Sequence, residues 1–179
     1  DMVGNLLMLA RLESGSSAKA SQTCRLDQML AQQLVHFSDR IVERNVTLDN
    51  SAITPAAVLA PPELLTLVIR NVLDNAVSYA NEKGAIRVSL RKTDHGIVLE
   101  VANTGSAVSS AQSEQVFERF WRGDASRTDQ GRHSGLGLSI VQNVMRQIGG
   151  GVTVESSVGG WFTVVLLFPK HGGDGSHEV

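Results

Sequence analysis

The chain has 179 residues, 42% of them hydrophobic, and a formal net charge of −2 at pH 7. A hydrophobic share of this size excludes a wholly disordered chain, and the length suits one domain with its own core plus extra residues at the ends. The near-neutral charge gives no reason to expect nucleic acid or an anionic membrane as a partner.

Residues 1–13 carry apolar side chains at helical spacing, and this helix ends at a glycine and a serine-rich stretch. We interpret residues 1–15 as the tail of a longer helix whose apolar face packs on another helix or on a second copy of the chain. A linker is expected at residues 16–24. The single cysteine, Cys24, excludes an internal disulfide and a cysteine-based metal cluster, and it fits a reducing compartment.

Two features of the sequence concern membranes. The N-terminus lacks a basic region followed by an apolar stretch, and the longest apolar runs, such as residues 164–168, are far too short to span a bilayer. We therefore expect a soluble chain.

A second helix is predicted over residues 27–44, with Asp27 as its cap. Its inward side chains would be Met29, Leu30, Leu34, Phe37, Ile41 and Val42. Short strands are predicted at residues 46–48 and 57–59. Two prolines at residues 61–62 then open the next helix, because proline is tolerated in a first helical turn.

The helix that follows, through residue 81, carries polar groups beside a broad apolar face. The apolar face consists of Leu64, Leu65, Val68, Ile69, Val72, Leu73, Ala76, Val77 and Ala80. Asn71, Asn75 and Tyr79 are four residues apart, so they stack in line on a helix and point the same way. Two carboxamides can then serve one ligand, and their oxygens suit a hard cation such as Mg²⁺, which usually keeps phosphate oxygens in its shell. The alternative is a helix whose polar residues simply face water.

Residues 85–90 and 97–103 alternate with period two around the turn residues 94–96, which predicts a β-hairpin. Residues 106–134 lose this periodicity, apart from residues 114–121. A loop of this length in a compact domain is usually functional or disordered.

Helical periodicity returns over residues 136–148 and ends at three consecutive glycines. Residues 152–156 and 161–168 predict a closing hairpin around Gly159-Gly160, and the polar tail over residues 171–179 is expected to be disordered. Because helices and strands come in blocks and not as strict strand-helix-strand repeats, we predict an α+β fold, a two-layer α/β sandwich.

A short segment at the end of a predicted strand is suited to bind a nucleotide base. The carbonyl oxygen of Asn103 can accept a hydrogen bond from a purine amine, while Gly105 lets the backbone come close to a ring. A carboxylate would accept that bond more strongly. Taken alone, Asn-x-Gly is equally typical of an ordinary turn.

A stronger signal lies at the start of the helix over residues 136–148. Its residues are Ser134, Gly135, Leu136, Gly137 and Leu138. Glycine costs a helix roughly 1 kcal/mol relative to alanine, which indicates that this segment needs its bare backbone. Amide groups at a helix N-terminus, together with the helix dipole, form an anion site suited to phosphate. The alternative is that these glycines only allow close packing of helices.

The long loop also contains arginines and aromatic residues. Arg119, Arg122 and Arg127 suit contact with phosphate oxygens, whereas Phe117 and Phe120 anchor the loop to the core with or without a ligand. The five histidines have no metal-ligand spacing, so none is assigned to zinc. No serine or cysteine has the local context of a nucleophile.

Taken in order, four segments resemble the N, G1, F and G2 boxes of bacterial sensor histidine kinases. The segments are Asn71-x-x-x-Asn75, Asn103-x-Gly105, residues 117–120 and residues 135–138. Gly159-Gly160 matches the late glycine pair, and the resemblance covers about residues 25–170, the expected catalytic domain. Residues 1–15 are similar to the end of the second helix of a dimerisation and phosphoacceptor domain. The resemblance implies a Bergerat ATP-binding fold, with a mixed sheet of about five strands packed on three helices.

The resemblance also implies roles by position. Asn75 would be the Mg²⁺ ligand, Asn71 its neighbour at the phosphates, and Tyr79 a ring beside ATP. Asn103 would face the adenine amine, and Gly105 would shape that wall.

Further along the chain, residues 134–138 would hold the phosphates, and Arg119 and Arg122 would belong to a mobile lid. The chain departs from the family pattern at three places. Asn103 replaces the usual aspartate, Ala107 stands where a second glycine is common, and Ser78 occupies a place where many relatives have lysine. Such Asn-x-Gly versions are similar to those of heavy-metal-sensing kinases.

The implied activity is transfer of the γ-phosphoryl group of ATP to a histidine, for relay to a response regulator. No histidine here is followed by the acidic residue and downstream proline of the family's H box. The target is therefore expected upstream of Asp1, in an intact homodimer. The resemblance implies that this part is the cytoplasmic domain of a bacterial inner-membrane protein.

The same fold occurs in gyrase-, Hsp90- and MutL-like ATPases, which carry a glutamate at the place of Asn71. An asparagine cannot accept a proton at neutral pH, so slow hydrolysis is predicted. The alternative functions are a non-catalytic nucleotide-binding module, or pseudokinase, and an ATPase.

Overall fold

The computed structural model describes residues 21–123 and 134–170. Its strands are β1 (Gln22–Arg25), β2 (Thr47–Ile53), β3 (Ala57–Ala60), β4 (Ala85–Thr93), β5 (Gly96–Thr104), β6 (Gly151–Ser156) and β7 (Trp161–Pro169). Its helices are α2 (Leu26–Glu43), α3 (Pro62–Tyr79) and α4 (Gly137–Gln147), with short 3₁₀ helices η1 (Ser110–Gln112) and η2 (Gln115–Phe117). The predicted helix over residues 1–13, Arg127 and the tail over residues 171–179 lie outside the described residues.

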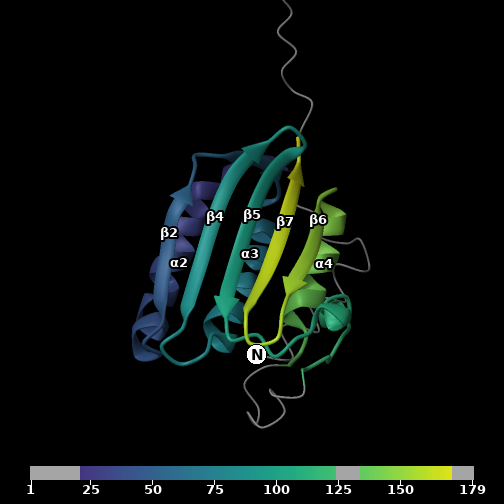
Figure 1. Ribbon diagram of the computed structural model, residues 1–179. Coiled ribbons are helices and arrows are strands. Elements are labelled where there is room, and N and C mark those ends of the chain that lie inside the picture. The colour runs from purple at the N-terminus through teal and green to yellow at the C-terminus, as the bar shows by residue number, and fades with distance from the viewer. Residues whose placement is uncertain (1–20, 124–133, 171–179) are drawn as a thin grey trace, which may run out of the picture.

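Five strands form one mixed sheet in the order β2-β4-β5-β7-β6. Strand β2 pairs with β4 in parallel, and every other pair in this sheet is antiparallel. Figure 1 shows α2, α3 and α4 side by side against one face of the sheet, with α3 in the middle. The predicted two-layer α+β sandwich with a five-stranded mixed sheet on three helices is confirmed.

The core lies between the sheet and the helices, where strand residues two apart point to the same face. One cross-strand row consists of Val88, Val101 and Val164, all buried. The adjacent row of the same face begins with Ile86 and Phe162, but its third member is Asn103, which is only 2% exposed. A buried carboxamide in an otherwise apolar row marks a special position, because buried polar groups cost free energy unless they bond.

Most predicted elements are confirmed. Both hairpins form around the expected turns, α4 fits the predicted helix, and Pro61 is the N-cap of α3 with Pro62 as its first residue. Strand β2 is longer than predicted, since it continues to Ile53. Val42 was expected to point inward but is 73% exposed, because its neighbour Ile41 takes the inward position of that turn.

The predicted capping role of Asp27 is wrong. Helix α2 begins one residue earlier, at Leu26, with Arg25 as its N-cap and no side-chain cap. The Asp27 carboxylate instead accepts bonds from the Arg25 guanidinium, at 2.7 and 3.0 Å, and from the Ala56 amide at 3.2 Å. The cause is strand β1, which was not predicted and which pairs antiparallel with β3. Residues 22–24 of the expected linker belong to this strand.

Asp27 is expected to make the folded protein sensitive to acid. The bond from Arg25 lowers the pKa of the Asp27 carboxyl from 3.8 to about 2, with help from the Ala56 amide. Because the pKa is depressed in the folded state, the stabilisation is present above pH 4 and is lost as the pH falls towards 2. Urea unfolding between pH 2 and 5 should show a loss of about 1 kcal/mol in wild type that Asp27→Asn lacks. Asp94→Asn, at the exposed turn between β4 and β5, is the control and should keep the pH dependence of wild type. An equal pH dependence in wild type and Asp27→Asn would contradict this role.

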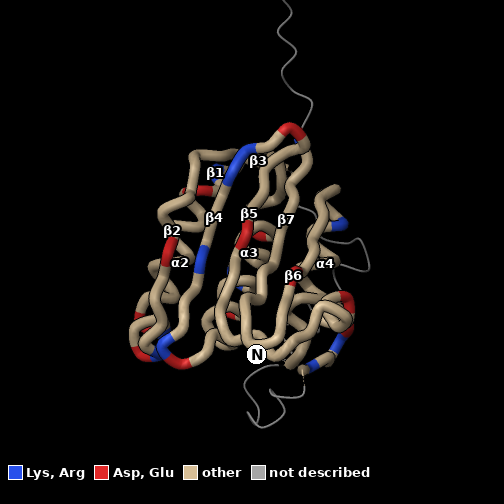
Figure 2. The backbone as a smooth tube through the Cα atoms, viewed as in Figure 1, with Lys and Arg blue, Asp and Glu red and all other residues tan. Residues whose placement is uncertain are grey.

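The charges of the sheet are mixed. Figure 2 shows acidic and basic positions interspersed over its strands and not gathered in one block. Among the described residues, no helix combines the length and the apolar character needed to cross a membrane.

Candidate functional site

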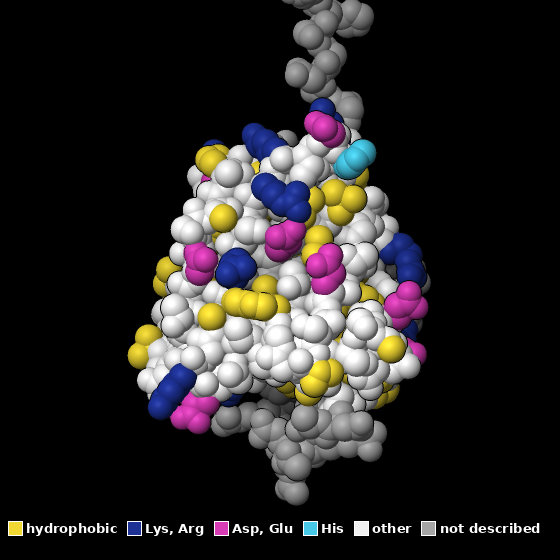
Figure 3. Space-filling model, viewed as in Figure 1, with side chains coloured by type: hydrophobic (Ala, Val, Ile, Leu, Met, Phe, Trp, Pro, Cys, Tyr) yellow, Lys and Arg dark blue, Asp and Glu magenta, His cyan; other side chains and the backbone are white. Residues whose placement is uncertain are grey.

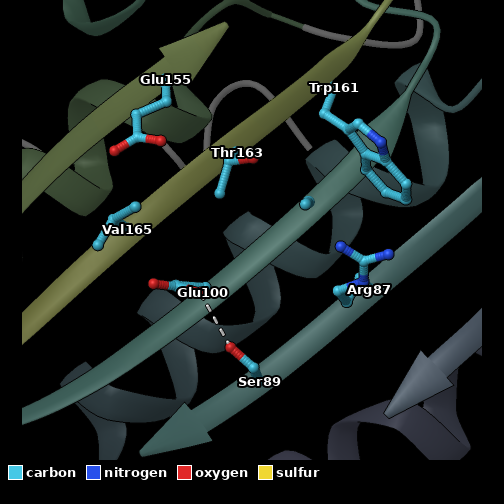
Figure 4. A pocket seen from close by; sticks show the side chains of 8 residues that line it. Arg87, Ser89, Glu100, Glu155, Trp161, Thr163 and Val165 are labelled. Atoms are coloured by element: carbon cyan, nitrogen blue, oxygen red, sulfur yellow. Dashed lines mark hydrogen bonds between the residues drawn. The ribbon is translucent and has the colours of Figure 1, made fainter. Parts of the chain in front are cut away.

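The helix-free face of the sheet has a pocket of about 200 Å³. Figure 3 shows this face, where apolar and charged side chains are intermixed, and Figure 4 shows the pocket from close by. It is lined by Arg87, Ser89, Glu100, Ala102, Glu155, Trp161, Thr163 and Val165.

Much of the polar chemistry of this pocket is already paired. The Glu100 carboxylate accepts bonds from Ser89 at 3.1 Å and from Arg91 at 2.6 Å. The Arg87 guanidinium lies 4.7 Å from the centre of the Trp161 ring, in a cation–π contact. These cross-strand pairs stabilise the sheet surface, and the pocket is separated from α3 by the sheet itself.

The second candidate lies on α3, where the structure places the predicted polar stripe. Asn71 and Asn75 are half-buried, and Tyr79, the last residue of α3, is 38% exposed. The Asn71 amide nitrogen donates to the Leu67 carbonyl at 2.8 Å, which leaves its side-chain oxygen as an acceptor. Asn75 makes no side-chain hydrogen bond to any described residue, so its carboxamide is available to a ligand.

The N-terminus of α4 meets this stripe. Gly137 is the first residue of α4, and a Cβ atom built on it would lie 3.2 Å from the carbonyl oxygen of Asn71. Leu136, the residue before, is fully buried and anchors this end of the helix in the core. The first amides of a helix have no intrahelical acceptor, so the start of α4 presents donors beside the carboxamides of α3. Ser134 and Leu138, the outer residues of the predicted segment, are half-buried.

Gly135 joins this segment to the aromatic one. Its carbonyl accepts a hydrogen bond from the Phe120 amide at 2.9 Å. Its φ is +67°, and a Cβ atom would lie 2.8 Å from backbone atoms of Phe120. Both features require glycine. Arg119 and Arg122 flank Phe120, the first exposed and the second half-buried, so they lie in the segment that Gly135 holds. The predicted anchoring of this segment is confirmed for Phe117, which packs against the core, and is wrong for Phe120, which is 53% exposed.

Asn103 faces the helix layer at the end of β5. Its amide nitrogen donates to the Thr104 carbonyl at 3.3 Å, which leaves its carbonyl oxygen as the acceptor. Gly105 follows with a φ of +84°, and its amide donates to the Gly160 carbonyl at 2.9 Å. The predicted Asn-x-Gly segment and the late glycine pair therefore lie together.

Asn81 belongs to this corner and was given no role by the sequence analysis. Its side-chain oxygen accepts a hydrogen bond from the Thr104 hydroxyl at 2.5 Å, and its backbone amide donates to the Thr104 carbonyl at 3.2 Å. A Cβ atom on Gly105 would lie 2.6 Å from the Asn81 Cβ. Asn81 thus ties the end of α3 to the end of β5. The predicted helix extended through residue 81, whereas α3 ends at Tyr79 and Ala80 is its C-cap, so Asn81 lies outside the helix.

The donor set limits what this region can bind. Within the described ranges, no three side chains of His, Cys, Asp or Glu come together as a metal site. A cation bound at Asn75 would therefore take a carboxamide oxygen and the oxygens of its ligand, which suits Mg²⁺ held with phosphate groups. The same region offers a buried acceptor for an amine at Asn103 and helix-start amides for an anion.

Known proteins resemble this chain in sequence and in fold. Residues 60–172 match the family described as histidine kinase-, DNA gyrase B-, and HSP90-like ATPase. The sensor protein CzcS of Cupriavidus metallidurans is 30% identical over 178 residues, covering 99% of this chain and 37% of that protein. The sensor-like histidine kinase SenX3 of Mycobacterium tuberculosis is 28% identical over 169 residues, covering 94% of this chain and 41% of that protein. The chain thus spans about two fifths of the length of these relatives.

Solved structures share the fold. The mycobacterial sensor histidine kinase MprB aligns with a TM-score of 0.72 and 24% identity, over 83% of this chain and 97% of that one. Full-length ShkA in complex with AMPPNP aligns with a TM-score of 0.76 and 24% identity, over 96% of this chain and 36% of that one.

Proposed function

Because this chain belongs to the family of histidine kinase-, DNA gyrase B- and HSP90-like ATPases, as an ATP-binding catalytic domain of the sensor histidine kinase type, we propose that it phosphorylates a histidine. The γ-phosphoryl group of ATP would pass to a histidine of the same signalling protein outside these 179 residues, and then to a response regulator. The observation that supports this proposal is the approach of Gly137 to Asn71, since it brings helix-start amides suited to phosphate beside carboxamides suited to a cation.

Each side chain of the site has a task in this proposal. Bound Mg²⁺ would draw charge from the phosphate oxygens, and the uncommitted carboxamide of Asn75 fits it as a ligand. Asn71 orients the phosphates beside the start of α4. Tyr79 provides a ring beside the nucleotide, and Asn103 accepts the adenine amine with Gly105 as the adjoining wall.

The segment around Gly135 completes the site. Backbone amides of residues 134–138 hold the phosphates at the N-terminus of α4. Arg119 and Arg122, in the segment bound to Gly135 through Phe120, stabilise the charge that develops during transfer.

Transfer to histidine is favoured over hydrolysis by one residue. Hydrolysis needs a base to activate water, and Asn71 occupies the place where the related ATPases have glutamate. Its amide nitrogen is already committed to Leu67, and its oxygen cannot take a proton at neutral pH. In the whole protein this domain would act within a homodimer, on the cytoplasmic side of a bacterial inner membrane.

The proposal is tested in two steps. Calorimetric titration with ATP, with and without Mg²⁺, should give binding that Mg²⁺ tightens. A fragment carrying the phosphoacceptor histidine is then added with labelled ATP, and acid-labile protein phosphate is expected. Absence of ATP binding would indicate a pseudokinase, binding without transfer would indicate a binding module, and rapid release of phosphate without the acceptor would indicate an ATPase.

Asn103→Ala is expected to lower the affinities for ATP and for adenosine equally, by about tenfold each, because both ligands carry the same amine. The loss of one buried hydrogen bond is worth about 1.4 kcal/mol, which corresponds to that factor. Asn50→Ala, on the exposed part of edge strand β2, is the control and should bind both ligands like wild type. Undiminished adenosine binding by Asn103→Ala would contradict the base contact.

A further inference from the structure

Arg40 of α2 reaches across to α3 and is fixed there by side-chain bonds. Its guanidinium donates to the Asp74 carboxylate at 2.6 Å and to the Ser78 hydroxyl at 3.0 Å. The same group lies 5.5 Å from the centre of the Phe37 ring. An arginine held at three points loses little further entropy when it meets a ligand.

Ser78, which accepts the bond from Arg40, lies on the side of α3 that carries the two asparagines. Ser78 follows Asn75 by three residues and Asn71 by seven, so on a helix it lies on the same side as both carboxamides. A serine carries no charge, but the bond from Arg40 brings a cation from another helix to this side of α3.

Arg40 also keeps capacity for a ligand. A guanidinium has five N–H donors, and its bonds to Asp74 and Ser78 use one each. Its side chain is 42% exposed, so its remaining donors are accessible to a ligand. The Asp74 carboxylate offsets part of its charge, which limits the expected effect to a moderate one.

We propose that Arg40 is a phosphate-binding residue of this domain, which supplies from α2 the positive charge that Ser78 lacks. This inference rests on the proposed function, because it needs a triphosphate at Asn75. The group recognised is the anionic phosphate chain of ATP or ADP, and not the nucleoside.

Calorimetry with ATP and with adenosine separates a phosphate contact from a structural one. Arg40→Ala should weaken ATP binding about tenfold and change adenosine binding less than about twofold. The matched control is Arg91→Ala, which removes an arginine–carboxylate pair of the same 2.6 Å length, Arg91 with Glu100, from the helix-free face. It should leave both affinities unchanged.

Two rescue variants sharpen the test. Arg40→Lys keeps the charge and should retain most of the ATP affinity. The double variant Arg40→Ala with Ser78→Lys places a cation directly on α3 and should recover ATP binding. If Arg40→Ala does not fold, Arg40→Gln keeps hydrogen bonding without charge and should show the same selective loss.

The outcomes distinguish the two proposals. Wild type that fails to bind ATP would contradict the proposed function and this inference with it. Wild type that binds ATP, with Arg40→Ala binding it as tightly or losing ATP and adenosine affinity alike, overturns only the role of Arg40. Recovery by the double variant supports a charge requirement, and no recovery argues against it.

Discussion

Asn75→Ala is expected to lower phosphoryl transfer at least about 100-fold and to remove the effect of Mg²⁺ on ATP affinity. The reason is that Asn75 spends no side-chain bond on any described residue, so its carboxamide oxygen is available to a cation. A 100-fold loss equals about 2.7 kcal/mol of transition-state stabilisation, a reasonable value for one lost metal ligand. The measurement is transfer of labelled phosphate to the acceptor fragment, together with calorimetry at several Mg²⁺ concentrations.

Stability provides the control for Asn75→Ala. Because the Asn75 side chain makes no hydrogen bond to a described residue, its truncation to alanine should leave the melting temperature close to that of wild type. Asn143→Ala is the matched variant, since Asn143 is also a half-buried helical asparagine, and it donates to the Ser139 carbonyl of its own helix. It should keep full Mg²⁺ dependence. If Asn75→Ala still responds to Mg²⁺ like wild type, the cation is held elsewhere.

Gly135→Ala is expected to reduce ATP affinity by about 10- to 100-fold and to lower the free energy of unfolding. A left-handed conformation costs a residue with a Cβ about 1–2 kcal/mol, and here the φ is +67°. The added Cβ would also lie 2.8 Å from the Phe120 backbone, so a shift that relieves this contact would strain the hydrogen bond from the Phe120 amide to the Gly135 carbonyl. Both effects displace the segment that precedes α4. ATP titration and urea unfolding measure them separately.

Two other glycines separate strain from steric clash. Gly159 has a φ of +73° with nothing within 4 Å of its Cβ position, so Gly159→Ala carries strain alone. Gly151 has neither a positive φ nor a close neighbour, and Gly151→Ala should behave like wild type. ATP affinity should fall most in Gly135→Ala. Equal affinity in all three variants would show that the Gly135 backbone is not needed for binding.

Hydrophobic periodicity predicts α3, α4 and both hairpins because these elements bury one face along their whole length. Strand β1 has only four residues and a single buried side chain, Cys24, so no pattern identifies it. Its partner β3 lies more than 30 residues away along the chain. The capping prediction for Asp27 fails for the same reason, since the Ala56 amide that competes for its carboxylate is also distant in sequence.

The candidate site divides in the same way. Local spacing predicts where Asn71, Asn75 and the glycine segment lie on their own helices. The family resemblance identifies these segments as parts of one site. The side-chain contacts that connect elements could not be predicted. The bond from Arg40 to Ser78 spans 38 residues, and that from Thr104 to Asn81 spans 23. Such contacts depend on how two elements pack, and no sequence period encodes that packing.

The parallel pairing of β2 with β4 also determines the order in which the chain can fold. The hairpins β4-β5 and β6-β7 join neighbouring segments and can close within microseconds. Strand β2 reaches β4 only after β3 and the whole of α3 have crossed over, so its pairing bears a larger loop-closure entropy. We therefore expect this edge of the sheet to form late on the folding pathway, and the proposed binding residues of α3 to become ordered only when that crossover has docked.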